Sequence, residues 1–245
     1  MKTIGLIGGM SWESTASYYR LINEAVKQRL GGLHSAKLVL CSVDFAEIER
    51  MQAAGDWDSS GVLLAGAARA LESAGADFLL LCTNTMHKVA PAIQTAVHIP
   101  FLHIADATAD AIKAAGLSRV GLLGTRFTME QDFYTGRLRE RHGLEVLVPG
   151  LPDREVVHRV IYDELCLGHV VDASRGAYRR IIAGLVDRGA EAIVLGCTEI
   201  SLLVRGDDAS VPLFDTTDLH ARKAVDWALA EDAPAMRDTP GLQLP

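Results

Sequence analysis

The chain has 245 residues, of which 49% are hydrophobic and 22% are charged, and its formal net charge is −7. This composition is ordinary for a globular protein, and the mild negative charge argues against a nucleic-acid partner and against binding to a membrane surface. The longest apolar runs, such as 78–82, are far too short to span a bilayer. The chain starts directly with a strand-like segment and lacks the features of a signal peptide, so we expect a cytoplasmic location.

Short runs rich in Leu and β-branched residues alternate with Ala-rich segments of helical periodicity. The predicted strands are Thr3–Ile7, Lys37–Val43, Phe78–Cys82, Pro100–Ile104, Val120–Leu123, Leu144–Val148, Ala192–Leu195 and Leu213–Phe214. The predicted helices are Ser14–Arg29, Ser60–Ala74, Ala105–Ala115, Met129–Glu140, Val156–Leu165 and Ser174–Arg188. This alternation predicts an α/β fold with mostly parallel sheet and helices on both faces. We expect the Pro-containing tail Ala233–Pro245 to be loose.

An internal repeat sets the expected architecture. Three blocks match at nearly constant offsets: Lys2–Gly9 with Ser118–Thr125, Gly75–Thr83 with Gly189–Cys197, and Pro100–Asp106 with Pro212–Asp218. The repeat predicts two pseudo-symmetric halves, 1–103 plus 214–245 and 104–213, each with a strand that ends at the carboxyl edge of its sheet. Ligands of open α/β sheets bind at that edge, so we expect the active site in the cleft between the halves.

Two facing walls suit a reaction that needs opposite faces of one atom, and racemisation at Cα is the clearest case. One group removes the proton and another delivers a proton from the far side. Cys197, at a strand end, is the candidate base, because a thiol with a pKa of ~8.5 titrates lower near a helix N-terminus. A buried structural cysteine is the alternative from residue type alone. The repeat, Gly196 and the polar pair Thr198–Glu199 favour the catalytic interpretation.

Short polar side chains beside these strand ends are predicted to bind substrate. Asn84, Thr85 and Thr198 are candidate hydrogen-bond donors to a substrate carboxylate. Met10 and Ser11 lie in a strand-to-helix loop where backbone N–H groups can approach a ligand, and a tight turn capped by Ser11 is the alternative.

Other polar residues have two open interpretations. Thr125 is the repeat partner of Gly9 and should border the cleft, unless it is simply a helix cap. Arg50, Lys88 and Arg126 are candidates to pair with a substrate side-chain carboxylate, although each fits a solvated surface charge. The histidines His87 and His220 are candidates to position other groups or are structural.

The four cysteines, Cys41, Cys82, Cys166 and Cys197, include no C-x-x-C pair and no zinc-like spacing with histidine. We therefore expect reduced thiols and no metal site.

Three motifs carry a resemblance to a known family. They are G-L-I-G-G-M-S-W-E-S-T at Gly5–Thr15, C-T-N-T-M-H at Cys82–His87 and G-C-T-E at Gly196–Glu199, with shorter matches at 44–49, 122–125, 161–165 and 214–216. Together they resemble the aspartate/glutamate racemase family from about Lys2 to Leu229. The resemblance implies a two-domain, often dimeric enzyme that is independent of pyridoxal phosphate, with one Cys from each half acting as base and acid. It also suggests that Gln52 contacts substrate, whereas sequence alone favours an exposed helical glutamine.

The sequence departs from the family pattern at one catalytic position. Thr83 stands where the first-half Cys is usual, and Cys82 lies one residue earlier, where alternation along a strand points it to the core. This makes the chain most similar to the subgroup with T-N-T at this motif, the L-aspartate/glutamate-specific racemases, whose second-half Cys addresses the L enantiomer. Thr83 is expected either to relay a proton through water or to donate a hydrogen bond.

The resulting prediction is a cofactor-independent racemase of aspartate and glutamate, with Cys197 acting on the L side and an amino acid, a small molecule, as the substrate. We expect a homodimer. Two alternatives remain: a related thiol isomerase of the maleate isomerase or hydantoin racemase type, and a catalytically weak amino-acid-binding protein that kept the cleft but lost one base.

Overall fold

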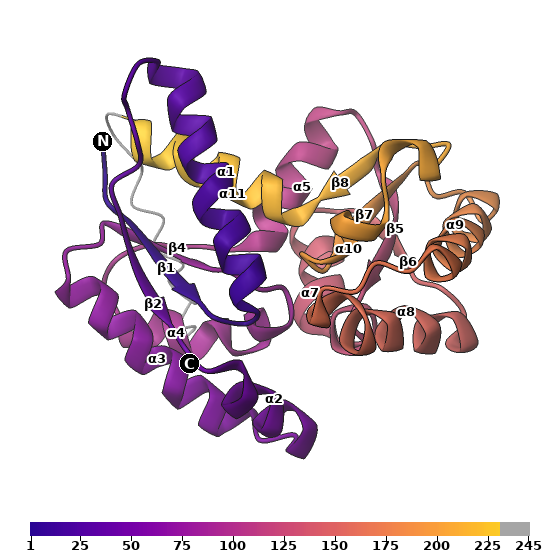
Figure 1. Ribbon diagram of the computed structural model, residues 1–245, viewed down its shortest axis with the longest axis horizontal. Coiled ribbons are helices and arrows are strands. Elements are labelled where there is room, and N and C mark those ends of the chain that lie inside the picture. Colours follow the sequence, from indigo (N-terminus) through magenta and orange to yellow (C-terminus); the bar gives the residue numbers. More distant parts are fainter. Residues whose placement is uncertain (231–245) are drawn as a thin grey trace, which may run out of the picture.

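A computed structural model describes residues 1–230, so the tail predicted to be loose, Ala233–Pro245, lies outside the described residues. Two four-stranded parallel sheets lie side by side (Figure 1). The first, ordered β2-β1-β3-β4, contains β1 Ile4–Gly8, β2 Leu38–Ser42, β3 Phe78–Leu81 and β4 Phe101–Leu102. The second, ordered β6-β5-β7-β8, contains β5 Arg119–Gly124, β6 Glu145–Leu147, β7 Ala192–Gly196 and β8 Leu213–Asp215. The equivalent strand orders confirm the predicted pair of parallel α/β halves.

Helices surround both sheets. The α-helices are α1 Trp12–Leu30, α2 Phe45–Ala54, α3 Trp57–Ser73, α4 Ala90–Ala96, α5 Ile104–Ala114, α6 Arg126–Glu130, α7 Asp132–Gly136, α8 Leu151–Asp163, α9 Asp172–Asp187, α10 Ile200–Leu203 and α11 Thr216–Leu229. Shorter turns are the 3-10 segments η1 Thr85–Val89, η3 Leu165–Leu167 and η4 Gly206–Asp208 and the π-helical η2 Arg137–Arg141. Within residues 1–230, no helix is long and apolar enough to cross a membrane.

The structure corrects one predicted helix. The single helix predicted at Met129–Glu140 is wrong, because Gln131 is extended (φ −103°, ψ 146°) and separates α6 from α7. The helical position predicted for Gln52 is confirmed, because this residue lies in α2, and both ends of α2 carry ordinary signals. The side chain of Asp44 accepts a hydrogen bond from the N–H of Ala46, and Gly55 ends the helix in the left-handed conformation.

Strand register places the two ends of the repeat at equivalent points. Leu81 of β3 pairs with β1, and Leu195 of β7 pairs with the repeat-equivalent residue of β5. Thr83 and Cys197 each come two residues after these paired leucines. Both therefore lie at the carboxyl edge of their own sheet, where the two halves meet.

The helix α11 joins the halves. Its buried side chains Ala221, Ala224 and Val225 pack with Tyr18 and Ile22 of α1 in the core over one face of the first sheet. In Figure 1, this yellow helix leaves β8 in the second sheet and runs back beside α1. The predicted division of the chain at 103/104 and 213/214 stays a prediction.

Gly9 directly follows β1 and lies in the loop that leads to Met10 and Ser11. Gly9 has φ +95°, and a Cβ placed on it would lie 2.2 Å from the carbonyl oxygen of Val43. We therefore expect Gly9→Ala to lower the free energy of unfolding by more than about 3 kcal/mol, through backbone strain and overpacking together. Urea denaturation measures the change. The matched control Gly55→Ala, also at positive φ but with no described atom within 4 Å, should cost about 1 kcal/mol. Equal losses would contradict the steric argument.

Candidate active site

One pocket lies between the carboxyl edges of the two sheets, and its cavity volume is about 20 Å³, which is room for about one water molecule. Its lining comprises Met10, Ser11, Phe45, Gln52, Thr83, Asn84, Thr85, Thr125, Ile161, Tyr162, Cys166, Cys197, Thr198 and Glu199. The structure brings together in this set the two predicted catalytic residues, Cys197 and Thr83, and the predicted substrate-binding residues Met10, Ser11, Gln52, Asn84, Thr85, Thr125 and Thr198. Their individual roles stay predictions.

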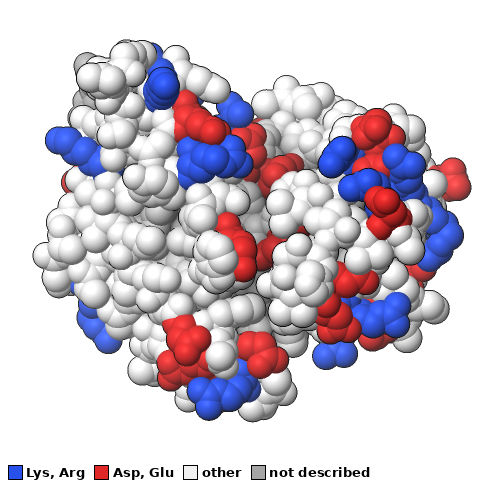
Figure 2. Space-filling view, viewed as in Figure 1, with Lys and Arg blue, Asp and Glu red and all other residues white. Residues whose placement is uncertain are grey.

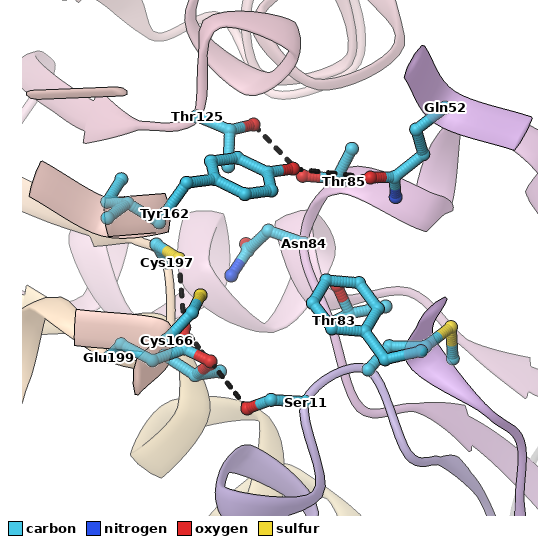
Figure 3. A pocket seen from close by; sticks show the side chains of 14 residues that line it. Ser11, Gln52, Thr83, Asn84, Thr85, Thr125, Tyr162, Cys166, Cys197 and Glu199 are labelled. Carbon is cyan, nitrogen blue, oxygen red and sulfur yellow. Dashed lines mark hydrogen bonds between the residues drawn. The ribbon is translucent and has the colours of Figure 1, made fainter. Parts of the chain in front are cut away.

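The predicted catalytic residues lie on opposite sides of the pocket. Cys197 follows β7 and Thr83 follows β3, and Asn84 lies between them in Figure 3. Both side chains are buried except for a small accessible part, with 9% of each residue exposed. A molecule held beside Asn84 would thus have a thiol on one side and a hydroxyl on the other.

The carboxylate of Glu199 accepts hydrogen bonds from the side chains around it on the Cys197 side of the pocket. Its Oε2 accepts hydrogen bonds from Cys197 Sγ at 2.9 Å and from Thr198 Oγ1 at 2.7 Å. Its Oε1 accepts a hydrogen bond from Ser11 Oγ, in the other half of the molecule, at 2.8 Å (Figure 3). Glu199 is itself buried, so these three donors replace the water that a carboxylate would otherwise bind. The network orients Cys197 and links the two halves at the pocket.

The environment of Cys197 corrects the prediction of a thiol with a lowered pKa. Burial raises the pKa of Cys197 well above its ordinary value, and the negative charge of Glu199 raises it further. The expected helix N-terminus is the short α10, which begins only at Ile200. The sulfur therefore carries its proton and donates a hydrogen bond to Glu199.

Three polar residues of the site were missing from the sequence prediction: Glu199, Tyr162 and Cys166. Glu199 and Tyr162 lie within the motifs G-C-T-E and I-Y-D-E-L, so the signal was present but no role had been given to them. Cys166 follows the second motif directly and gives the pocket a second thiol. Burial raises the pKa of Cys166, as do the charges of Glu199 and Glu13.

Two further hydrogen bonds cross the cleft. The hydroxyl of Tyr162, in α8, donates to Gln52 Oε1, in α2, at 3.2 Å. The hydroxyls of Thr85 and Thr125 are 2.9 Å apart, and Thr125 also accepts a hydrogen bond from the N–H of Thr128 as the cap of α6. Thr125 thus both caps a helix and borders the pocket, and Ser11 likewise caps α1. Gln52 is buried, contrary to the exposed position that sequence alone favoured.

Asn84 presents an acceptor to the pocket. Its Nδ2 donates to Thr216 Oγ1 at 3.0 Å, and that hydroxyl donates in turn to the carbonyl oxygen of Leu195 at 2.8 Å. Because the Thr216 proton is used in this way, the Asn84 amide must face it with its nitrogen. The buried Oδ1 of Asn84 has no hydrogen-bond partner among the described residues. It is therefore suited to a ligand N–H, such as a substrate ammonium.

Cys82, His87 and His220 are buried outside the pocket, where their contacts stabilise the fold. Cys82 is fully buried in the core beside Tyr18, as predicted, and burial raises its pKa. His87 lies behind the Thr83 wall, where its Nδ1 donates to the Thr83 carbonyl oxygen at 2.7 Å and its Nε2 accepts from the N–H of Ile104. His220 accepts a hydrogen bond from the Tyr18 hydroxyl at 2.8 Å. Burial lowers the pKa of both histidines, which keeps them neutral.

The three candidate cations do not line the pocket. Arg50 is exposed and donates to the carbonyl oxygen of Ala46, and Arg126 is exposed as well. The ammonium of Lys88 donates to Gln131 Oε1 at 2.7 Å and lies 4.0 Å from the centre of the Trp57 ring. Within residues 1–230, there is no group of three or more His, Cys, Asp and Glu side chains placed to hold a metal ion.

Two parallel sheets that meet at one pocket define a two-domain α/β protein of the racemase fold. The family model for Asp/Glu/hydantoin racemases matches residues 7–224, and the chain belongs to that family. Its structure is similar to that of a Yersinia pestis protein proposed to be an Asp/Glu racemase, with 60% identity, a TM-score of 0.89, and coverage of 94% of this chain and 100% of that one.

Two other similar proteins are more distant. An aspartate racemase homologue from Pyrococcus horikoshii has 37% identity and a TM-score of 0.81, and the match covers 93% of this chain and 99% of that one. A broad specificity amino-acid racemase of Bacillus subtilis is 23% identical over 93% of this chain and 98% of its own length.

Proposed function

We propose that this protein is a cofactor-independent amino-acid racemase, with aspartate and glutamate among its substrates, and that Cys197 transfers the proton on the L side. One observation carries the proposal: the Cys197 thiol and the Thr83 hydroxyl face one pocket from opposite halves. Membership of the Asp/Glu/hydantoin racemase family supports the reaction class.

The hydrogen bond between Cys197 and Glu199 gives a route to the base. The thiol proton passes to Glu199 Oε2, which leaves a thiolate at the edge of the pocket. The thiolate then takes the Cα proton of an L-amino acid, and the electron pair of the broken C–H bond stays on the substrate. An ammonium bound to Asn84 Oδ1 beside these groups would favour the anionic forms. Such a positioned acid–base pair contributes about 10²- to 10⁴-fold to a rate.

The opposite face needs a proton donor. A water molecule held by the Thr83 hydroxyl can protonate Cα there, which gives the D enantiomer and leaves hydroxide. Return of the Glu199 proton to solvent neutralises the hydroxide and completes the balance. An alcohol is a much weaker acid than a thiol, so we expect this step to be slow relative to exchange on the Cys197 side.

Thr83→Cys should therefore raise the rate of inversion equally in both directions, because the enantiomers are equal in energy, and should raise Cα exchange most when the substrate is the D enantiomer. A thiol near pKa ~8.5 exchanges protons where an alcohol does not. In D₂O, NMR gives the rate of Cα exchange and chiral chromatography gives the rate of inversion. The wild type should exchange the L enantiomer faster than it inverts it, and Thr83→Cys should narrow this gap. Equal exchange and inversion in the wild type, or no gain in the variant, would show that another group serves this face.

The basic assay incubates the purified protein with each enantiomer of aspartate and glutamate. Chiral chromatography should show inversion that persists after treatment with a chelator and without added pyridoxal phosphate. A catalytically weak binding protein would bind these amino acids without any exchange at Cα, and a maleate isomerase or hydantoin racemase would turn over other substrates. The homodimer and the cytoplasmic location stay predictions.

A further inference from the structure

We propose that this pocket prefers amino acids whose side chain is polar but uncharged, so that asparagine and glutamine are better substrates than aspartate and glutamate. The inference rests on the proposed racemase function and concerns the specificity of the same site. It follows from where charges lie around the pocket and from the hydrogen-bonding groups opposite the thiol.

The charge already in the pocket is negative. Glu199 is buried there and accepts hydrogen bonds from three side chains. Glu13, in the first turn of α1, acts electrostatically on the pocket thiol of Cys166, and its Oε2 is buried with no hydrogen-bond partner among the described residues. Acidic side chains also lie along the furrow between the halves on the face shown in Figure 2. A substrate with a second carboxylate would bring another negative charge to this place.

An amino acid fits a negatively charged pocket best when its own net charge is zero. The ammonium of any amino acid can meet Glu199 and Asn84 Oδ1, and its carboxylate makes the molecule neutral overall. A charged side chain leaves a net negative charge that has to be desolvated near two carboxylates. Two candidate counter-charges, Lys88 and Arg126, do not line the pocket: the ammonium of Lys88 lies over the Trp57 ring, and Arg126 is exposed to solvent.

The polar groups that bridge the cleft match an amide better than an acid. Gln52 Oε1 is an acceptor that now holds the Tyr162 hydroxyl, and Gln52 Nε2 donates only to the sulfur of Met86, at 2.9 Å. A thioether is a weak acceptor, so this N–H can be given to a ligand at little cost. Gln52 and the Thr85–Thr125 hydroxyl pair thus offer both donors and acceptors. An amide uses both kinds of partner, whereas a carboxylate can only accept.

An amide amino acid and the corresponding acid have nearly the same shape, so a comparison of the two measures the effect of the side-chain charge alone. We would measure kcat/KM for Cα exchange in D₂O with L-asparagine against L-aspartate and with L-glutamine against L-glutamate. Each amide should exceed its acid by about tenfold or more, the effect of one like charge at a partly buried site. Rates for the acids that equal or exceed those for the amides would overturn the inference and leave the proposed function intact.

Three variants test which residues determine the preference for amides over acids. Gln52→Lys places a cation in the pocket and should shift the acid-to-amide ratio of kcat/KM towards the acids by about tenfold. Lys88→Gln and Arg126→Gln should leave the ratio unchanged, and a fall in the ratio in either would show that this cation reaches the substrate and would overturn the inference. A protein that exchanges none of the four amino acids would contradict the proposed function instead. Calorimetric binding of the same pairs would then still decide the charge preference, with tighter binding of the acids counting against it.

Discussion

Replacing Cys197 with alanine is expected to lower Cα–H exchange of L-amino acids by at least about 10³-fold, since the nucleophile or base of such a site has no substitute at the same position. Cys197 lies at the end of β7, and its sulfur donates to Glu199 across 2.9 Å. The half-buried hydroxyl of Thr198 already donates to the same carboxylate and cannot replace the thiol. Proton NMR in D₂O measures the loss of the Cα–H signal directly.

Cys166→Ala is the matched control for this experiment. Cys166 is the other thiol of the pocket, and removal of its sulfur leaves the Cys197–Glu199 hydrogen bond in place. Exchange should remain within about tenfold of the wild-type rate, because only packing at the pocket edge changes. Circular dichroism and the melting temperature establish that both variants are folded. Undiminished exchange in a folded Cys197→Ala protein would exclude the thiol mechanism, and loss of exchange only in Cys166→Ala would assign the base to the other cysteine.

Glu199→Gln has the second largest expected effect, a fall in L-side exchange of about 10²-fold. The amide keeps the size of the side chain and can still hold Ser11, but it cannot accept the proton of the Cys197 thiol. Glu155→Gln, an exposed change in α8, is the control and should leave the rate unchanged. A normal rate in Glu199→Gln would show that the thiol loses its proton by another route.

Glu199→Gln should slow exchange and at the same time lower the pKa of the Cys197 thiol. The negative charge of Glu199 is one cause of the raised pKa of Cys197, after burial. Its removal should lower this pKa, so that the thiolate forms at a lower pH although exchange is slower. Thiolate absorbance in the ultraviolet against pH, taken as the difference from a Cys197→Ala background, reads this shift. In the wild type, the pKa of Cys197 is raised well above its ordinary value, so the fraction of thiolate, and L-side exchange with it, should rise only in the alkaline range.

The sequence predicted the architecture because the repeat and the strand periodicity are local signals. Strands of four to six residues with Leu and Val side chains stand out, and the register of the repeat placed Thr83 and Cys197 at equivalent edges. The helix α11 was not among the predicted helices, although the helical position of Gln52 in α2 was predicted. The segment Met129–Glu140 contains mostly helix-forming residues, and the structure interrupts it at Gln131, where the backbone is extended.

The sequence predicted which residues line the pocket better than it predicted their hydrogen-bond partners and pKa values. Strand ends and motifs identified the residues that line the pocket, but hydrogen-bond partners depend on contacts across the cleft. The link from Ser11 to Glu199 joins side chains 188 positions apart, and no local pattern specifies it. The sign of the pKa shift at Cys197 was wrong for the same reason, since burial and a neighbouring carboxylate outweigh the effect of the short α10. The unpartnered oxygen of Asn84 likewise depends on Thr216, in the distant α11.

The most direct test of the central claim is the wild-type protein in D₂O with a pure L-amino acid, followed at once by NMR and by chiral chromatography. The account predicts that deuterium enters Cα of the L enantiomer first and that the deuterated D enantiomer appears more slowly, with no cofactor added. Binding of the amino acid without any entry of deuterium at Cα would contradict it, and so would inversion in which the original hydrogen is retained at Cα throughout.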